Sequence, residues 1–380
     1  MIRLKLCVFP NDPIKSYYEK GEIKKRYFNP DNIFEEIHII SFTEDDVKEE
    51  KVKEIAGNAR LIIHSLGHVN LKNRKKQLKV IKKIVSDIKP DVIRTFNPLI
   101  QGWCAAKCAI DLKIPLFVSL HTQYDQNRKI LKKTNFKKFL LLKYTEKMIE
   151  PFVLKHANVI TAVFRIIEPY VQKHTKTKPI ILHNKINLKQ FEKAKGNESL
   201  PKNLIISVGR LNQEKNHQCI IEAIKDLDVN LLIIGNGEMY KELVQLIEKL
   251  GIQDKVTIIK KVENQKIAQY YKAAKIFALA YNPKQEGLPI PVIEAMAANL
   301  PIVISKPEEE FSEGLENCVI FSERTPVDFK KNICKLLNDN ELQEKILKNL
   351  KVKVEEFDEK ILEKKESKIY SDIMKNFNPT

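Results

Sequence analysis

Short apolar runs alternate along the chain with longer stretches in which apolar residues recur at helical spacing. Runs such as 91–96 and 116–120 are rich in β-branched and aromatic residues, which is typical of strands buried on both faces of a parallel sheet. The strands predicted in the first half are 3–9, 36–41, 60–64, 91–96, 115–120, 158–162 and 179–182. The helices predicted between them are 72–88, 99–112, 136–156 and 166–174.

The same alternation restarts after a polar stretch, residues 193–201, that contains Gly196 and Pro201 and is typical of a linker. The strands predicted after it are 204–208, 230–234, 255–259, 276–279 and 301–304. The predicted helices are 217–225, 239–250, 264–274, 291–298, 328–337 and 340–352, followed by a charged amphipathic helix over 357–377.

Strands that alternate with helices in both halves predict two α/β domains, each a Rossmann-like, doubly wound parallel sheet. A chain of 380 residues is also too long for one ordinary core. We expect a first domain over 1–192, a linker over 193–201, a second domain over 202–354, and a C-terminal helix over 355–380 that extends the second domain or crosses back to the first. Ligands bind at the carboxyl ends of such strands, so two facing domains would enclose a cleft.

The composition is that of a globular chain from a reducing compartment. Apolar residues make up 43% of the chain, and no apolar run approaches the ~20 residues that span a bilayer. The short, charged start after Met1 lacks the pattern of a signal peptide. Six scattered cysteines without a CxxC pair argue against a zinc site and a disulfide framework. The expected location is the cytoplasm, with peripheral attachment to the inner membrane face as an alternative.

Positive charge is concentrated in the first half. The net charge is +17, and residues 1–195 hold 39 basic and 20 acidic residues, which leaves 27 basic and 29 acidic residues for the remainder. This asymmetry indicates either an anionic partner or a lysine-rich, well-solvated surface. The basic helix predicted over 136–156 has two interpretations: it lies on an anionic membrane near a lipid-linked acceptor, or it packs on its own sheet, which is favoured.

Two glutamates, Glu286 and Glu294, flank the start of a predicted helix. Gly287 and Leu288 form a turn between them, and Pro291 suits the first helical turn because its missing N–H has no partner to lose there. The unpaired N–H groups at a helix start attract phosphates. A loop carboxylate, a helix carboxylate and an anion-binding helix start together predict a pocket for a phosphorylated, hydroxyl-rich ligand.

A second loop, residues 207–216, follows the strand 204–208. Gly209 permits a sharp exit from the sheet, and Arg210 and Lys215 lie before the next helix. Two cations beside a helix start could clamp a diphosphate, with arginine as a fork and lysine as a point charge. Taken alone, the loop is equally well explained as a solvated turn with incidental charge.

Taken together, the two loops resemble the nucleotide-sugar domain of the family 4 GT-B glycosyltransferases, the retaining glycosyl transferases group 1. Several motifs occur in the family's order and spacing, and the resemblance is strong over about residues 200–340. The matching segments are 207–216, 232–238, 286–298 and 301–304. Segments 114–121, 156–161 and 181–191 resemble the family's N-terminal half more weakly.

The resemblance implies a role for each matching residue. Arg210 and Lys215 would hold the donor diphosphate and neutralise the leaving nucleoside diphosphate. Glu286 would orient the sugar near its anomeric carbon, and Glu294 would accept hydrogen bonds from the ribose hydroxyls. His121, from the first domain, would close over the sugar. The implied catalytic residues are therefore Glu286, His121, Lys215 and Arg210.

Further contacts are implied around these groups, with the base near 260–262. The additional donor contacts are Gly209, Gly287, Leu288, Ile290 and Lys261. Pro289 stands where the family often has a glycine, and the loop after the first strand contains one glycine instead of several. These departures bear on the acceptor more than on the reaction, and the expected acceptor contacts are Gly21, Lys24 and Asn97.

The implied activity is a metal-independent, retaining transfer of a hexose-type sugar from a UDP- or GDP-sugar to a hydroxyl of a glycan, a lipid-linked molecule or a small molecule. No cofactor is expected besides the donor. Asp226 and Asp228 have the DxD spacing of metal-dependent transferases but end a predicted helix, which favours a surface role. The alternatives are a sugar-nucleotide epimerase of the same architecture, and a nucleic-acid-binding protein, although no nucleic-acid motif occurs.

Overall fold

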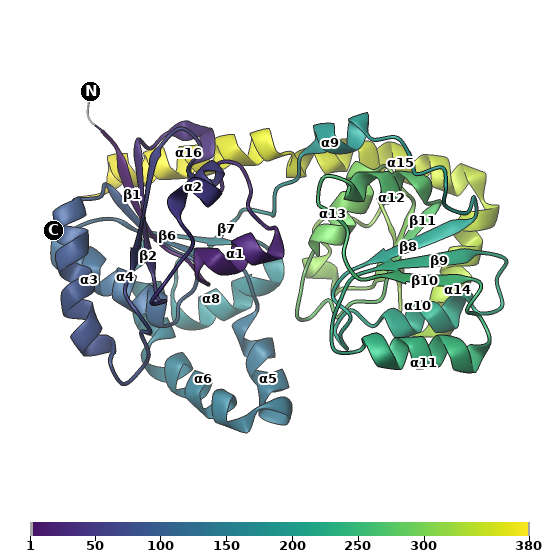
Figure 1. Ribbon diagram of the computed structural model, residues 1–380, viewed down its shortest axis with the longest axis horizontal. Coiled ribbons are helices and arrows are strands. Elements are labelled where there is room, and N and C mark those ends of the chain that lie inside the picture. Colours follow the sequence, from purple (N-terminus) through teal and green to yellow (C-terminus); the bar gives the residue numbers. More distant parts are fainter. Residues whose placement is uncertain (1–2, 379–380) are drawn as a thin grey trace. The chain divides into compact units, whose positions relative to one another are not determined.

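The computed structural model describes residues 3–378, which divide into two compact units (Figure 1). Unit 1 contains the chain up to His183 together with the segment from Leu362 onward, and unit 2 contains Asn184–Ile361. Residues 193–201, predicted as a linker, lie inside unit 2. The N–H of Asn197 in this segment donates a hydrogen bond to the carbonyl of Gln269, at 3.1 Å.

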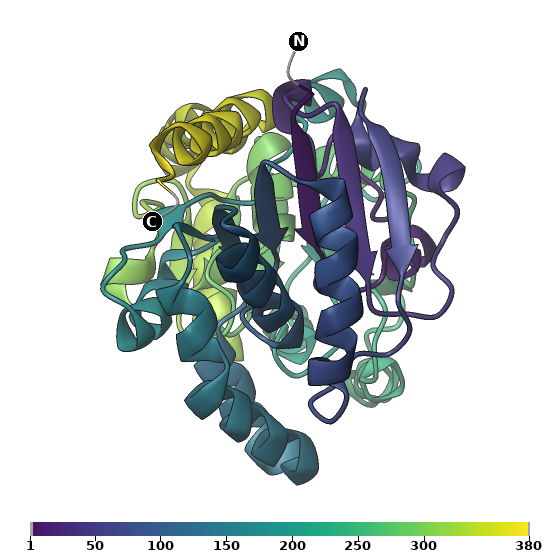
Figure 2. The same ribbon diagram turned by 90° about the vertical axis from the view of Figure 1, so that its left-hand side faces the viewer.

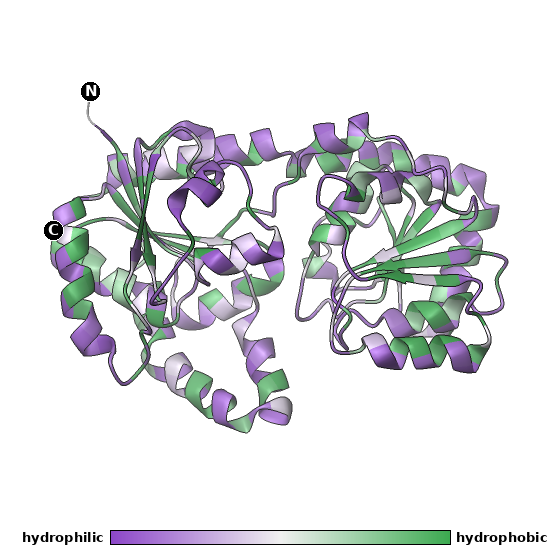
Figure 3. Cartoon of the chain, viewed as in Figure 1, coloured by the Kyte–Doolittle hydropathy of each residue, from purple (hydrophilic) through white to green (hydrophobic). Residues whose placement is uncertain are grey.

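Unit 1 contains a seven-stranded sheet in the order β3-β2-β1-β4-β5-β6-β7, and every recorded strand pair is parallel. In register, Leu6 of β1 lies opposite Ile37 of β2 and Val92 of β4. The strands are β1 Lys5–Phe9, β2 Glu36–Ser41, β3 Arg60–Ser65, β4 Val92–Thr95, β5 Leu116–Leu120, β6 Val159–Ala162 and β7 Ile180–Ile181. All seven strands were predicted from the sequence, and the continuous apolar character of inner strands such as β5 follows from burial on both faces (Figure 3).

The helices of unit 1 differ from prediction in two ways. The helix predicted over 136–156 is two helices, because the chain turns at Ile149, and Pro151 in the first turn of the second helix has no N–H to continue a helix ladder. The helices over 14–20, 49–52 and 124–134 were not predicted. The helices are α1 Ile14–Lys20, α2 Glu49–Val52, α3 Arg74–Ile88, α4 Ile100–Leu112, α5 Tyr124–Thr134, α6 Phe136–Met148, α7 Glu150–Lys155 and α8 Glu168–His174, with 3-10 turns at Pro30–Asn32, Lys53–Ala56 and Arg165–Ile167.

Helices α5 and α6 extend away from the body of unit 1, at the lower end of the view in Figure 2. Within α6 only Thr145 is buried. The favoured expectation that 136–156 packs on its own sheet is therefore wrong for α6, whose lysines and apolar residues are too evenly distributed to form a single buried face.

Unit 2 contains a six-stranded sheet in the order β10-β9-β8-β11-β12-β13, with parallel pairing throughout its recorded ladders. The strands are β8 Leu204–Val208, β9 Asn230–Ile234, β10 Val256–Ile259, β11 Ile276–Leu279, β12 Ile302–Ser305 and β13 Ile320–Ser322. The helices are α9 Leu188–Lys193, α10 His217–Ile224, α11 Tyr240–Leu250, α12 Ile267–Ala273, α13 Ile290–Ala297, α14 Pro326–Asn338 and α15 Asn340–Lys353, with 3-10 turns at Glu309–Phe311 and Val354–Phe357. The short edge strand β13 and helix α9 were not predicted.

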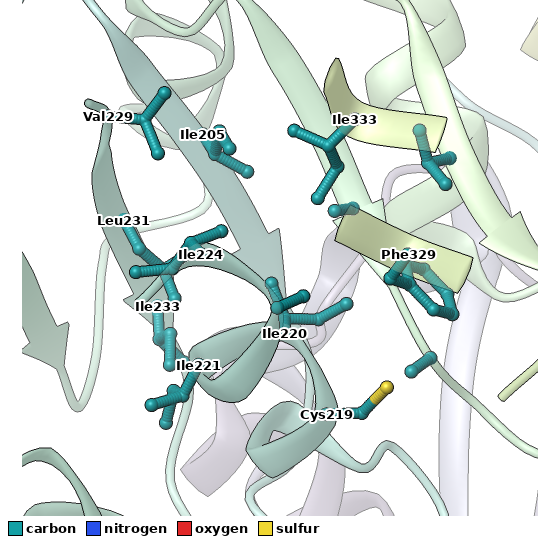
Figure 4. Packing of buried hydrophobic residues seen from close by; sticks show 14 of the residues in the cluster. Ile205, Cys219, Ile220, Ile221, Ile224, Val229, Leu231, Ile233, Phe329 and Ile333 are labelled. Carbon is teal, nitrogen blue, oxygen red and sulfur yellow. The ribbon is translucent and has the colours of Figure 1, made fainter. Parts of the chain in front are cut away.

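The core of unit 2 lies between the sheet and helices α10 and α14 (Figure 4). Ile220 and Ile224 of α10 and Phe329 and Ile333 of α14 are buried against strand residues such as Ile205. Burial of each such side chain contributes about 1.5–3 kcal/mol relative to leaving it exposed. This packing holds the start of α10, and therefore the loop that precedes it, against the sheet.

The C-terminal helix α16, Glu359–Asn376, contributes to the core of unit 1 from Leu362 onward. Ile369, Tyr370 and Ile373 belong to the same apolar cluster as β1 and β2. Two buried carboxylates of α16 also pair with arginines of unit 1: Glu366 with Arg94, and Glu363 with Arg26. The helix is therefore part of the packed body of unit 1.

Candidate functional site

The sheet of unit 2 reverses its strand order between β8 and β11, and parallel α/β sheets bind ligands at the carboxyl ends of such neighbouring strands. The loop after β8 holds Gly209, Arg210 and Lys215, and the loop after β11 holds Glu286. Two sequence motifs more than seventy residues apart therefore meet at one edge of the sheet.

The loops after β8 and β9 are joined through their backbones. The N–H of Gly209 donates to the carbonyl of Ile234, and the N–H of Leu211 donates to the carbonyl of Asn236, both at 3.0 Å. A Cβ on Gly235 would lie 1.9 Å from the carbonyl oxygen of Gly209, and a Cβ on Gly237 would lie 2.3 Å from that of Leu211. The glycines of the 232–238 motif are therefore required by close backbone approach.

Lys215 is buried beneath this loop, with 9% of its surface exposed. Its N–H donates to Asn212 Oδ1 at 3.0 Å, and its side chain passes Gly209, where an added Cβ would lie 3.3 Å from Lys215 Cδ. Its Nζ donates to Glu286 Oε2 at 2.5 Å. Because 37% of the Glu286 side chain is exposed, this ion pair stands at the surface of the unit and is accessible to a ligand.

The loop that carries Glu286 is held by internal hydrogen bonds. The N–H of Asn282 donates to the carbonyl of Glu214 at 2.8 Å, and the N–H of Glu286 donates to the carbonyl of Asn282 at 3.2 Å. The hydroxyl of the buried Tyr281 donates to the carbonyl of Gly287 at 2.8 Å. The position of the Glu286 carboxylate is therefore set by backbone contacts with the lysine loop itself.

Helix α13 begins at Ile290, directly after Pro289, which takes an extended conformation as its N-cap. Leu288 is buried and Ile290 is 38% exposed. The first N–H groups of a helix have no partner within it and favour anions, whereas Pro289 and Pro291 offer no N–H. Ile290 is accordingly the first residue of α13 that presents a donor at this helix start.

Glu294 is oriented by a residue that the sequence reasoning missed. Tyr271 of α12 is fully buried, and its hydroxyl donates to Glu294 Oε2 at 2.8 Å. The same hydroxyl lies 3.2 Å from the carbonyl oxygen of Pro291. Burial, and then the adjacent carboxylate, raise the pKa of Tyr271 well above its ordinary value, so the hydroxyl keeps its proton and acts as a donor. The sequence does contain a signal for this role: a tyrosine within an apolar helix face, whose buried hydroxyl requires a hydrogen-bond partner.

The remaining predicted donor contacts, Arg210 and Lys261, are exposed on the loops after β8 and β10. Neither forms an ion pair within residues 3–378, so both charges are available to a ligand. The neighbouring Lys260 differs, because its Nζ lies 4.0 Å from the ring centroid of Tyr240. Among the described residues, no group of three or more His, Cys, Asp or Glu side chains is placed to hold a metal ion.

In unit 1, His121 follows β5 and stacks on Phe96, with ring centroids 5.4 Å apart. Desolvation, and then the positive charge of Arg94, lower the pKa of His121 below its ordinary value. His121 as a whole residue is nevertheless exposed to solvent. A neutral imidazole that can donate or accept a hydrogen bond is therefore available at this strand end.

The three predicted acceptor contacts lie at different places in unit 1. Asn97 is buried where the strand order reverses between β1 and β4, and its Nδ2 donates to Asn11 Oδ1 at 3.1 Å. Gly21 ends α1 in a left-handed conformation with φ 72°, which explains the glycine without a ligand. Lys24 is half-buried in the loop that follows.

His217, the first residue of α10, is a second site residue that the sequence reasoning did not assign. It is 1% exposed, and its Nδ1 lies 3.0 Å from Ser207 Oγ of β8. Its Nε2 has no hydrogen-bond partner within residues 3–378. Burial lowers the pKa of His217 to about 4, so the ring is neutral at the base of the lysine loop.

This burial predicts a pH-dependent stability of unit 2. Between pH 6.5, the ordinary value, and about pH 4, the unfolded chain binds a proton at His217 that the folded chain does not bind. The free energy of unfolding should therefore fall as the pH is lowered through this window, by about 3 kcal/mol at most. Urea unfolding followed by far-UV circular dichroism at several pH values measures the slope.

His217→Gln should remove this part of the slope, whereas His68→Gln, at an exposed histidine, should leave it unchanged. An unaltered slope in His217→Gln would show that His217 is not held neutral by the fold.

Two family models match adjacent stretches of the chain. Glycosyltransferase Family 4 matches residues 35–190, and Glycosyl transferases group 1 matches residues 189–353. An uncharacterized glycosyltransferase of Methanocaldococcus jannaschii is 23% identical over 321 residues, which is 83% of each chain. The Campylobacter jejuni GalNAc-alpha-(1->4)-GalNAc-alpha-(1->3)-diNAcBac-PP-undecaprenol alpha-1,4-N-acetyl-D-galactosaminyltransferase is 24% identical over 298 residues, 75% of this chain and 76% of its own.

Solved structures share the fold over almost the whole chain. A glycosyltransferase from Rickettsia africae has a TM-score of 0.74 at 18% identity and covers 99% of this chain and 100% of its own. Anabaena HepE in complex with UDP has a TM-score of 0.72 at 14% identity, with 97% and 100% covered. At these identities the likeness establishes the two-domain GT-B fold, and the family models cover both of its halves. The chain therefore belongs to the GT-B glycosyltransferases of family 4, with a group 1 domain in its C-terminal half.

Proposed function

We propose that the protein transfers a hexose-type sugar, with retention of configuration, from a nucleoside diphosphate to a hydroxyl acceptor. The observation that carries this proposal is the 2.5 Å pair between Lys215 and Glu286 at the edge of the unit 2 sheet. It places a fixed cation and a carboxylate beside a helix start, next to the carboxylate of Glu294 held by Tyr271. Such a set can bind phosphate, sugar hydroxyls and ribose hydroxyls at once.

The proposed reaction breaks the bond between the anomeric carbon and a phosphate oxygen, and the diphosphate leaves with the electron pair. Lys215 and Arg210 stabilise the charge that develops on the diphosphate, which accelerates the reaction because this charge is greatest near the transition state. The acceptor oxygen forms the new bond on the same face of the sugar, and its proton passes to the departing phosphate oxygen. In this proposal the two side-chain cations supply the positive charge, so no added divalent ion is required.

The two glutamates have separate roles in the proposal. Glu286 accepts hydrogen bonds from sugar hydroxyls while Lys215 holds its carboxylate in place, and Glu294 accepts hydrogen bonds from the ribose. The N–H groups near Leu288 and Ile290 bind phosphate, and Gly209 and Gly287 allow the ligand to approach the backbone. His121 in unit 1 remains the proposed sugar contact, with Asn97 and Lys24 on the acceptor side.

The Anabaena structure was solved with UDP, and the Campylobacter relative is named for an undecaprenol-diphosphate-linked acceptor. We therefore propose a UDP-sugar as donor and a lipid-linked glycan as acceptor. The corresponding process is cell-surface polysaccharide or glycoconjugate synthesis at the cytoplasmic face of a membrane. No helix among the described residues is long and apolar enough to cross a bilayer.

A donor screen tests this proposal. A ligand that binds only the folded chain raises its stability by about 2.7 kcal/mol at a hundredfold excess over its dissociation constant, so UDP and one UDP-sugar should raise the melting temperature. GDP and GDP-mannose form the comparison arm, and a protein lacking the Lys215 charge, Lys215→Met, is the matched control that should lose the shift. A wild-type protein that responds to none of these nucleotides would contradict the proposed donor site.

The donor that binds is then incubated with the protein, with and without EDTA, and the products are separated by mass spectrometry and NMR. Transfer or hydrolysis that releases the α-configured sugar from an α-linked donor, undiminished by EDTA, is the expected result. Release of an epimerised nucleotide sugar would instead support the epimerase alternative. A strict requirement for a divalent ion would contradict the proposed role of Lys215 and Arg210.

A further inference from the structure

Helix α6 presents a stripe of large apolar side chains, interrupted by lysines, to solvent. Phe136, Leu140, Tyr144 and Met148 recur at every fourth position and therefore lie along one side of the helix, with Leu141 beside them. Their exposed fractions are 57%, 53%, 43% and 55%, and that of Leu141 is 47%. Of the thirteen exposed large apolar side chains among the described residues, five lie on this one helix. Such a concentration marks an interaction surface.

The stripe is not needed to hold the helix in place, because α5 and α6 are anchored by a buried polar cluster. Arg128 of α5 is 3% exposed, and its Nη1 donates to Glu150 Oε1 at 2.9 Å, while its Nη2 donates to Asp125 at 2.6 Å. Thr145 of α6 donates to the same fully buried Glu150 at 2.8 Å, and Tyr170 donates to it at 2.5 Å. These contacts anchor the side of α6 that faces the unit. The exposed apolar stripe is therefore not required to hold the helix in place.

Lysines surround and interrupt the stripe. Residues 124–148 contain eight basic and two acidic residues, a net charge of +6. All seven lysines of this segment are exposed: Lys129, Lys132, Lys133, Lys137, Lys138, Lys143 and Lys147. Lys143 pairs with Glu146 at 2.8 Å, and the other six form no ion pair within residues 3–378. The charge of the segment is therefore not neutralised by the protein itself.

We propose that this surface, the α5–α6 arm of residues 124–148, docks the protein on an anionic lipid bilayer. The apolar stripe would enter the boundary between headgroups and acyl chains, and the lysine stems would extend along it so that the ammonium groups reach lipid phosphates. A protein partner fits this pattern less well, because the buried centres of protein interfaces are depleted in lysine. In Figure 3 the arm shows this mixture of apolar and polar positions, in contrast to the mostly apolar strands of unit 2.

The docking surface is separate from the donor site, which lies in unit 2, so this proposal does not depend on the assigned sugar transfer. It goes beyond the proposed function by naming the surface that would bring the protein to a membrane-borne acceptor. The chemistry of the arm requires negative lipid headgroups, but no particular headgroup structure, because lysine acts as a point charge.

Vesicle flotation tests the proposal. Wild-type protein should float with vesicles of phosphatidylcholine and phosphatidylglycerol, should float much less with phosphatidylcholine alone, and should be released by added salt. The variant Leu140→Ser, Leu141→Ser should lower the partition onto anionic vesicles by about tenfold, and Lys137→Glu, Lys138→Glu should do so as well. Wild-type protein that fails to bind anionic vesicles would overturn the proposal.

Matched controls are available on unit 2. Val327 and Val352 are 79% and 71% exposed, and Lys241 and Lys249 lie exposed on α11. Val327→Ser, Val352→Ser and Lys241→Glu, Lys249→Glu should bind vesicles like wild type, and equal losses in arm and control variants would overturn the proposal. All variants should retain the wild-type melting temperature and nucleotide-induced shift, which separates a failure of this proposal from a failure of the donor site.

Gel filtration tests whether the arm binds a second copy of the chain instead of a membrane. If the leucine variant turns an oligomer into a monomer while vesicle binding is unchanged, the arm is an interface between copies and the membrane proposal is wrong.

Discussion

Replacing Glu286 with glutamine is expected to lower kcat/KM for sugar transfer by about a hundredfold to a thousandfold, the loss typical of removing one preorganised electrostatic contact. The substitution keeps the size of the side chain and one oxygen acceptor. It removes the negative charge that binds Lys215 Nζ at 2.5 Å and that would strengthen the hydrogen bonds to sugar hydroxyls. Steady-state kinetics with the donor identified by the screen measures the effect.

Lys215→Met should cause a loss of similar size, because it removes a buried cation from beside the leaving diphosphate. The double variant should lose much less than the product of the two single losses, since groups that act as a pair are not additive. Multiplicative losses would show that the two residues act independently.

An exposed ion pair on the same unit provides the control. Glu263 and Lys266 lie 3.1 Å apart with side chains 68% and 59% exposed, and Glu263→Gln should leave kcat/KM near the wild-type value. If Glu286→Gln retained wild-type turnover while Glu263→Gln did the same, the proposed site would have to be placed elsewhere. Retained melting temperatures in both variants would show that the comparison is free of folding defects.

The main elements of this site were predictable from the sequence because each is governed by local chemistry. A glycine after a buried strand and a proline at a helix start determine where loops end, and both motifs fall at carboxyl ends of strands in a parallel sheet. Lys215 and Glu286 meet because β8 and β11 are neighbours in the sheet, whereas the sequence analysis placed the two residues in one pocket only through the family resemblance. Helix α13 begins at Ile290, one residue before the predicted position, because its start is determined by the local proline sequence.

Residues that act through burial were not predictable in this way. Tyr271 and His217 look like ordinary members of helical patterns, and their partners Glu294 and Ser207 are known only once the helices are packed on the sheet. The periodicity of 136–156 likewise gave one helix packed on the sheet, because spacing alone cannot show that Glu150 is taken up by Arg128 and Thr145 at the helix junction.

Replacing Glu366 with alanine is expected to lower the free energy of unfolding of unit 1 by about 3–5 kcal/mol, since it leaves a buried charge without its partner. Arg94 is 4% exposed on β4, and its Nη1 lies 2.5 Å from Glu366 Oε1 and 2.8 Å from the hydroxyl of Tyr370. Its guanidinium carbon also lies 4.4 Å from the ring centroid of Phe96. The same loss would loosen α16, which supplies Tyr370 to the core of this unit.

Urea unfolding followed by tryptophan fluorescence measures the effect in unit 1, because the only tryptophan of the chain, Trp103, lies in α4 of this unit. The matched control is Asp111→Asn, which breaks the exposed pair of Lys82 and Asp111, 2.8 Å apart, and should cost less than about 1 kcal/mol. Replacing both partners, Arg94→Met with Glu366→Met, should recover most of the stability, because apolar side chains of similar volume remove both charges together. If Glu366→Ala cost no more than Asp111→Asn, the ion pair would not hold α16 to unit 1. If the double variant were as unstable as Glu366→Ala, the loss would come from packing and not from an unpaired buried charge.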